Sequence, residues 1–166
     1  GGSIAFTSQE GVGSQFVIRI PFKIDEEHKN ERVKESASAS IEGLNVLLVE
    51  DNELNMEIAR FIIENEGARV TCATNGKEAV DIYKNAPESF DIILMDIMMP
   101  EMDGYEATRM IREMDLNIPI VAMTANAFME HKIKAKKAGM NAHVSKPLDK
   151  DILIRVISKL CGYKLK

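Results

Sequence analysis

Short apolar runs alternate with amphipathic stretches from residue 44 onward. Five runs are rich in β-branched residues and predict strands: NVLLV, ARVTCAT, FDIILM, IPIVAMT and NAHVSK. Each run precedes a stretch with apolar residues at helical spacing, which gives five strand–helix units. The third and fourth runs are apolar almost throughout, as in strands buried on both faces. This alternation predicts an α/β fold in which helices cover both faces of a parallel sheet.

The amphipathic stretches predict five helices. In the first, Leu54, Ile58 and Ile62 recur at four-residue spacing, and Gly67 ends the helix. The others cover KEAVDIYKNA, YEATRMIREM, AFMEHKIKAKKA and KDILIRVISKL. With right-handed crossovers, these (βα)5 units form a doubly wound, five-stranded parallel sheet in the flavodoxin-like order 2-1-3-4-5.

Residues 1–22 alternate between apolar and polar positions and predict a β-hairpin, with Gly11 and Gly13 in its turn. The apolar positions share one face: Ile4, Phe6, Phe16, Ile18 and Ile20. A lone two-stranded hairpin is marginally stable in water, so this segment resembles a piece of a larger sheet. Residues 23–43 hold four basic and six acidic residues and a SASAS run, which predicts a linker, partly helical.

Composition narrows the class of protein. The 166 residues fit one ordinary domain plus an appendage, and 45% hydrophobic with 28% charged residues is a globular composition. The net charge of −5 argues against a nucleic-acid partner, and no apolar stretch approaches the roughly 20 residues of a membrane span. Cys72 and Cys161 lack metal-ligand spacing and favour packed thiols in a reducing compartment. With no signal-peptide pattern at residue 1, we expect a cytoplasmic location, any membrane anchor belonging to a parent protein.

Polar residues follow the predicted strands at the edge where ligands bind in such sheets. Strand one ends in Glu50-Asp51, strand three in Asp96, strand four in Thr124-Ala125 and strand five in Lys146-Pro147. A single strand-end acid is usually a helix N-cap, and Asp51 or Asn52 is a candidate cap for the first helix. Three converging acids instead repel one another, and a divalent cation with oxygen ligands (Mg²⁺, Mn²⁺ or Ca²⁺) relieves that repulsion.

A carboxylate at a strand end can also act as the nucleophile of phosphoryl transfer and form an acyl phosphate. Donors must then surround the transferred group where its charge sits. Thr124, Lys146 and the backbone N–H groups that follow Asp96 and Thr124 fit that description.

The series LLVEDNELN, ILMDIMMPEMDG, VAMTANA and VSKP resembles the receiver domain of two-component signalling, in the form found in hybrid histidine kinases, over residues 44–163. The resemblance implies that Asp96 is the phosphoacceptor. It implies that Asp51, Asp96 and the Met98 main-chain carbonyl bind Mg²⁺ (or Mn²⁺) directly, with Glu50 acting mostly through water.

The same resemblance implies how the phosphoryl group is held. Thr124 and the Ala125 N–H bind its oxygens with the Met98 main chain, Lys146 pairs with it, and the bond to Pro147 is cis. Many family members carry Tyr or Phe as a switch where this chain has His143. The residue itself leaves two interpretations open, a half-exposed strand histidine or a pH-sensitive switch that works with Thr124.

Residues 1–22 resemble the closing hairpin of the ATP-binding domain of sensor histidine kinases. The resemblances divide the chain into a hairpin remnant (1–22), a linker (23–43) and a receiver (44–163). The ATP lid and the phosphoaccepting histidine of that family are absent from this sequence, so the chain would catalyse only its own phosphorylation and dephosphorylation. The implied partners are a phosphohistidine donor, either its own kinase or a histidine phosphotransfer protein, and a second copy bound through roughly residues 126–161.

Two other functions use the same residues. A Mg²⁺-dependent phosphatase resembling the haloacid dehalogenase group needs an acid two residues after the nucleophile, and Met98 stands there. A phosphorylation-independent interaction domain would not require all five polar strand-end residues, which are intact. A nucleotide- or flavin-binding domain would need a glycine- or hydroxyl-rich loop where EDNELN stands.

Overall fold

The computed structural model describes residues 2–21, 40–125 and 129–162, without the side chains of 129–131. Most of the predicted linker lies outside the described residues. The described residues form two compact units, one within 1–37 and one within 38–166. Among the described residues, no helix is long and apolar enough to cross a membrane.

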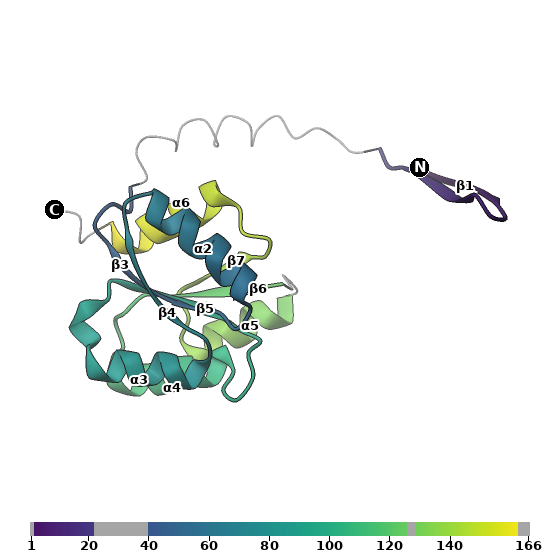
Figure 1. Cartoon of the computed structure of the whole chain (residues 1–166). Coiled ribbons are helices and arrows are strands. Elements are labelled where there is room, and N and C mark those ends of the chain that lie inside the picture. Colours follow the sequence, from purple (N-terminus) through teal and green to yellow (C-terminus); the bar gives the residue numbers. More distant parts are fainter. Residues whose placement is uncertain (1, 22–39, 126–128, 163–166) are drawn as a thin grey trace. The chain divides into compact units, whose positions relative to one another are not determined.

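The second unit is a five-stranded parallel sheet in the order β4-β3-β5-β6-β7, which confirms the predicted order (Figure 1). Its strands are β3 (Asn45–Val49), β4 (Arg69–Ala73), β5 (Ile92–Asp96), β6 (Ile120–Thr124) and β7 (Ala142–Ser145). The helices are α2 (Glu53–Asn65), α3 (Gly76–Asn85), α4 (Gly104–Met114), α5 (Met129–Ala138) and α6 (Lys150–Cys161), with a 3-10 turn at Pro87–Ser89.

Two apolar cores lie on the two faces of the sheet. Along β3, Leu47 and Val49 face the core shared with α3, α4 and α5, whereas Val46 and Leu48 face the core shared with α2 and α6. Because successive side chains of a strand alternate in direction, a strand that serves both cores must be apolar at every position. The first polar residue after each apolar run marks the end of a central strand. Because these strands are parallel and in register, the residues that follow them lie along the same edge of the sheet.

The inward face of α2 differs from the predicted spacing. Ala59 and Ile63 are buried, whereas Leu54 is 65% and Ile58 47% exposed, and Ile62 is only half-buried. The buried pair has the same four-residue spacing one position later, and one position rotates the face by about 100°. The spacing of apolar residues thus allowed two choices for the buried face of this helix. Because the face with Ala59 and Ile63 is the buried one, Leu54 and Ile58 lie on the outer surface of α2.

The folded unit also begins earlier than the predicted boundary at residue 44. Ile41, assigned to the linker, is fully buried in the core beneath α2 and α6. Its carbonyl accepts the Leu44 N–H at 3.1 Å, and the Gly43 N–H donates to the Gly67 carbonyl at 2.9 Å. Ile41 directly follows the polar SASAS run, so its place in the core was not evident from the surrounding sequence.

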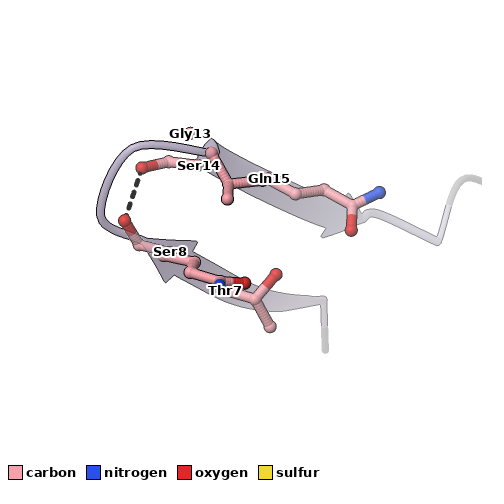
Figure 2. Close-up of a pocket in the computed structure, with 7 residues that line it drawn as sticks. Thr7, Ser8, Gly13, Ser14 and Gln15 are labelled. Carbon is pink, nitrogen blue, oxygen red and sulfur yellow. Dashed lines mark hydrogen bonds between the residues drawn. The ribbon is translucent and has the colours of Figure 1, made fainter.

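The first unit is the predicted hairpin, β1 (Ser3–Gln9) and β2 (Gly13–Arg19). Ile4 pairs with Ile18 and Phe6 with Phe16, whose rings stack 5.9 Å apart. Near the turn, Ser8 Oγ and Ser14 Oγ lie 2.8 Å apart in a hydrogen bond (Figure 2). Gly11 and Gly13 have positive φ angles of 78° and 123°: Gly11 lies in the turn, as predicted, and Gly13 begins β2 directly after it. The apolar face is exposed, as expected for one layer of a larger sheet.

Candidate functional site

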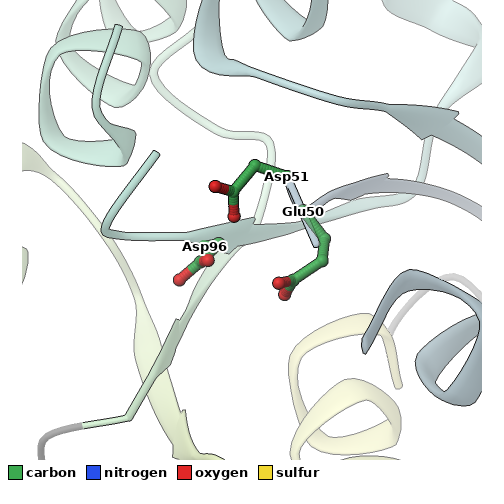
Figure 3. A group of neighbouring side chains, drawn as sticks. All are labelled: Glu50, Asp51 and Asp96. Carbon is green, nitrogen blue, oxygen red and sulfur yellow. The ribbon is translucent and has the colours of Figure 1, made fainter. Parts of the chain in front are cut away.

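Three carboxylates meet where β3 and β5 end. Oxygen atoms of Glu50, Asp51 and Asp96 lie within 4.8 Å of one another (Figure 3). Glu50 and Asp96 are 2% and 5% exposed, whereas Asp51 is open to solvent. Adjacent parallel strands bring their carboxyl ends to the same edge, so residues 45 positions apart become neighbours. An all-oxygen cluster with one open side fits a Mg²⁺ ion, which retains several waters when bound.

Lys146 is the positive member of this cluster. Its Nζ lies 2.5 Å from Glu50 Oε2 and 2.8 Å from Asp96 Oδ2. Burial alone lowers the pKa of Lys146, but hydrogen bonds and charge attraction from Asp96 and Glu50 outweigh it and raise the pKa. The ammonium therefore stays charged and leaves the cluster with two uncompensated negative charges, which a divalent cation would offset.

The backbone fixes the position of Lys146. Its N–H donates to the Thr124 carbonyl at 2.8 Å, and the Lys146–Pro147 peptide bond is cis, as the resemblance implied. Thr124 ends β6 and is 4% exposed. Its neighbour Ala125 is exposed and is the last described residue before 126–128. Thr124 thus stands at the strand end beside Asp96, as predicted.

The loop after Asp96 is packed against the strand end. The Met98 N–H donates to Asp96 Oδ1 over 3.4 Å, while the Met98 side chain is 71% exposed. A Cβ at Gly104 would lie 2.1 Å from the Asp96 carbonyl oxygen, and the Gly104 N–H donates to the Ile97 carbonyl at 3.0 Å. Asp103 caps α4 by accepting the Glu106 N–H. The Asp96 carboxylate therefore sits at the end of β5, where the loop that follows is tightly held.

His143 lies within β7, opposite Ala122 of β6, and is exposed. Partial desolvation lowers its pKa, and the positive charge of Lys132 lowers it further. Among the described residues, no hydrogen bond or ion pair joins its side chain to the acid cluster, so the choice between a plain strand histidine and a switch stays open.

Asn55, the last residue of the LLVEDNELN motif, is a site residue for which no role was predicted. Asn52, one of the two predicted candidates, caps α2, and its Oδ1 accepts the Asn55 N–H at 3.0 Å. This places Asn55 in the first turn, where its Nδ2 donates to Glu50 Oε1 at 3.0 Å. A polar residue in the first helical turn after a strand-end acid could have indicated this contact from the sequence.

A small pocket of about 90 Å³ adjoins the cluster on the α2 side. It is lined by Glu50, Asn55, Ile58, Lys146, Pro147 and Leu148. Its lining therefore combines the charged side chains of the cluster with apolar side chains.

Known proteins have sequences similar to this chain. The sequence-family model of the response regulator receiver domain matches residues 46–158 of this chain. The aerobic respiration control sensor protein ArcB of Escherichia coli is 37% identical over 163 residues, which are 96% of this chain and 20% of that protein. Hybrid signal transduction histidine kinase M of Dictyostelium discoideum is 41% identical over 120 residues, 69% of this chain and 5% of that protein. The chain thus spans a fifth or less of these relatives.

Solved structures give the same result for the fold. The receiver domain of a sensor histidine kinase from Pseudomonas aeruginosa, with a magnesium ion coordinated in its active-site cleft, has a TM-score of 0.68 and 37% identity over 72% of this chain and 98% of that one. The receiver domain of the yeast (Saccharomyces cerevisiae) response regulator Ssk1, crystallised with the histidine phosphotransfer protein Ypd1, has a TM-score of 0.70 and 29% identity over 75% of this chain and 93% of that one.

Proposed function

The chain belongs to the response regulator receiver family of two-component signalling, and from that membership we propose that Asp96 accepts a phosphoryl group from a phosphohistidine. The observation that carries the proposal is the contact of Asp96 with two further acids and with Lys146 at the carboxyl edge of the sheet. A purely structural acid would not be buried at the centre of a cluster of like charges.

The transfer would form a bond between an Asp96 carboxylate oxygen and phosphorus while the bond from phosphorus to the donor imidazole nitrogen breaks. The electron pair of the broken bond stays on the imidazole, which takes up a proton. Lys146, the Thr124 hydroxyl and the main-chain N–H groups of Met98 and Ala125 would hold the phosphoryl oxygens. Thr124 and His143, on neighbouring strands, would then form the switch that changes the surface of β7 and its neighbouring helices.

A bound Mg²⁺ would supply charge neutralisation between the carboxylates and the phosphoryl oxygens. Asp51, Asp96 and the Met98 main-chain carbonyl are the proposed direct ligands, and Glu50 acts through water. The magnesium-bound relative supports this choice of ion. Mn²⁺, which also prefers oxygen ligands, would serve in the same place.

The donor would dock on the outer surface of α2. Leu54, Ile58 and Phe61 are 65%, 47% and 69% exposed and recur at spacings that place them on one side of the helix. Ile58 also lines the pocket beside Glu50 and Lys146, so this apolar stripe leads to the acid cluster. The complex of the yeast receiver with Ypd1 supports a histidine phosphotransfer protein as donor, and the chain's own kinase is the other candidate.

The parent protein would be a cytoplasmic or membrane-anchored hybrid histidine kinase. The alignment with ArcB includes the hairpin region, which supports assigning residues 1–22 to the end of an ATP-binding domain. The chain itself would not phosphorylate a histidine. Its activity would be limited to phosphorylation and dephosphorylation of Asp96.

Incubation with acetyl phosphate and Mg²⁺ tests the acceptor. We expect one phosphate per chain, labile to hydroxylamine as acyl phosphates are, and none in Asp96→Ala. Asp81→Ala, which removes an exposed acid from α3, is the matched control and should accept phosphate normally. Undiminished uptake in Asp96→Ala would show that the phosphate goes to another residue.

A further inference from the structure

Asn55 is held beside the acid cluster by the start of α2. The Asn52 cap fixes the backbone of the first turn, since Asn52 Oδ1 accepts the Asn55 N–H at 3.0 Å. From this fixed backbone the short Asn55 side chain reaches Glu50 Oε1, with 3.0 Å between Nδ2 and Oε1. The contact joins α2 to the end of β3.

Glu50 is 2% exposed, and both of its oxygens have a partner from a different part of the chain. Oε1 accepts from Asn55, and Oε2 lies 2.5 Å from Lys146 Nζ. The same ammonium lies 2.8 Å from Asp96 Oδ2. Two donors, one on each oxygen, therefore restrain the Glu50 carboxylate, and the shared ammonium links Oε2 to Asp96.

We propose that Asn55 is a positioning residue for the metal, because it keeps Glu50 turned toward the space between Asp51 and Asp96. This inference rests on the proposed function, in which these acids bind Mg²⁺. Without the amide donor, Oε1 would lose a charge-assisted hydrogen bond, and the carboxylate would be free to turn toward the pocket lined by Ile58. Partners that orient a ligand in this way commonly change metal affinity.

The Kd of Mg²⁺, measured by calorimetry on the full chain, tests the proposal. We expect Asn55→Ala to raise this Kd about three- to tenfold, a smaller effect than that of a typical outer-shell residue because Glu50 itself acts through water. The thermal midpoint without Mg²⁺ should fall slightly, because Oε1 of the buried Glu50 loses a hydrogen bond, but the fold should persist, since Asn55 is exposed and alanine is a good helix former. Asn65→Ala is the matched control: it removes an exposed amide from the same helix about 15 Å away and should leave the Kd unchanged.

A double-mutant cycle with the isosteric change Glu50→Gln separates positioning from other effects. If Asn55 acts through Glu50, Asn55→Ala should have little further effect on the Kd in the Glu50→Gln background. Additive effects would overturn the proposal. It would also be overturned by an unchanged Kd in Asn55→Ala, or by a lower thermal midpoint without a change in Kd.

Asp51→Asn distinguishes this inference from the proposed function. If Asp51→Asn weakens Mg²⁺ binding and Asn55→Ala does not, only the role of Asn55 is wrong. If Asp51→Asn binds Mg²⁺ as well as the unsubstituted chain, the metal site itself is wrongly assigned.

Discussion

Two glycines allow close packing of the loop that follows Asp96. The Gly76 N–H donates to the Met102 carbonyl, and a Cβ at Gly76 would lie 2.5 Å from that same carbonyl oxygen. Gly104 meets the Asp96 carbonyl oxygen still more closely. Both obstacles are backbone atoms, which cannot rotate away as a flexible side chain would. The loop from Asp96 to Gly104 is therefore held by close backbone packing at both of its ends.

Gly104→Ala should destabilise the fold and slow phosphorylation together. A Cβ 2.1 Å from the Asp96 carbonyl oxygen must move either α4 or the end of β5. Overpacking of this kind costs about 1–3 kcal/mol or more, and here it would also displace Asp96, the proposed acceptor. Urea unfolding and the acetyl phosphate reaction measure the two effects. An unfolding midpoint equal to that of the unsubstituted chain would contradict the packing argument.

His143 should make the stability of the chain depend on pH, with a sign set by its surroundings. Desolvation and Lys132 lower its pKa in the folded state, so the unfolded chain binds the proton more readily. The free energy of unfolding should therefore decrease as the pH falls below about 6.5, the ordinary histidine value. His143→Gln should lack this part of the decrease. In NMR titration, Lys132→Ala should raise the pKa of His143, and an unchanged value would show that the lysine charge does not reach the ring.

At the scale of the elements, the strands and their end residues followed from the sequence alone. In a chain whose strand-like and helix-like segments alternate, a short apolar run such as FDIILM indicates a buried strand. The end of that run places Asp96 at the end of the strand. The buried face of helix α2, in contrast, had two possible interpretations. Leu54, Ile58 and Ile62 compete with Ala59 and Ile63 at the same spacing, and only packing against the sheet selects the second set. Asn55 was missed for the same reason, because its direction depends on that phase.

The phase of α2 leads to a prediction about the donor. Ile58→Ser and Phe61→Ser should lower phosphoryl transfer from a phosphohistidine donor about tenfold each, as loss of an interface anchor does. Transfer from acetyl phosphate should stay within about twofold, because the small donor needs no docking surface. Stopped reactions with a phosphorylated histidine phosphotransfer protein measure the first rate.

Ile133→Ser is the matched control for this surface. Ile133 lies on α5 and is 49% exposed, close to the 47% of Ile58, so the chemical change and the exposure are the same. It should leave transfer from the protein donor unchanged. Equal losses in Ile58→Ser and Ile133→Ser would mean that α2 is not the docking surface.

At the scale of the whole molecule, the chain divides into two units that differ in what stabilises them. The unit that begins near Ser38 has an apolar core on each face of its sheet. The hairpin has one apolar face, and its side chains Ile4, Phe6 and Phe16 are 65% exposed or more. Every strand-end residue of the proposed site belongs to the larger unit. The chemistry should therefore be independent of the hairpin.

Two truncations test this independence and the true start of the folded unit. Removal of residues 1–37 should leave both urea stability and the rate of Asp96 phosphorylation unchanged, because the contacts of Ile41 remain. Removal of residues 1–43 deletes Ile41, which is fully buried, and should cost about 2–5 kcal/mol, as loss of a large core side chain does. A tenfold loss of phosphorylation rate in the shorter truncation would show that the hairpin contributes to the site. Equal stability of the two truncated chains would show that the core does not need Ile41. A lower stability of the chain that lacks residues 1–43 would place the start of the folded unit before Ile41, within the segment assigned to the linker.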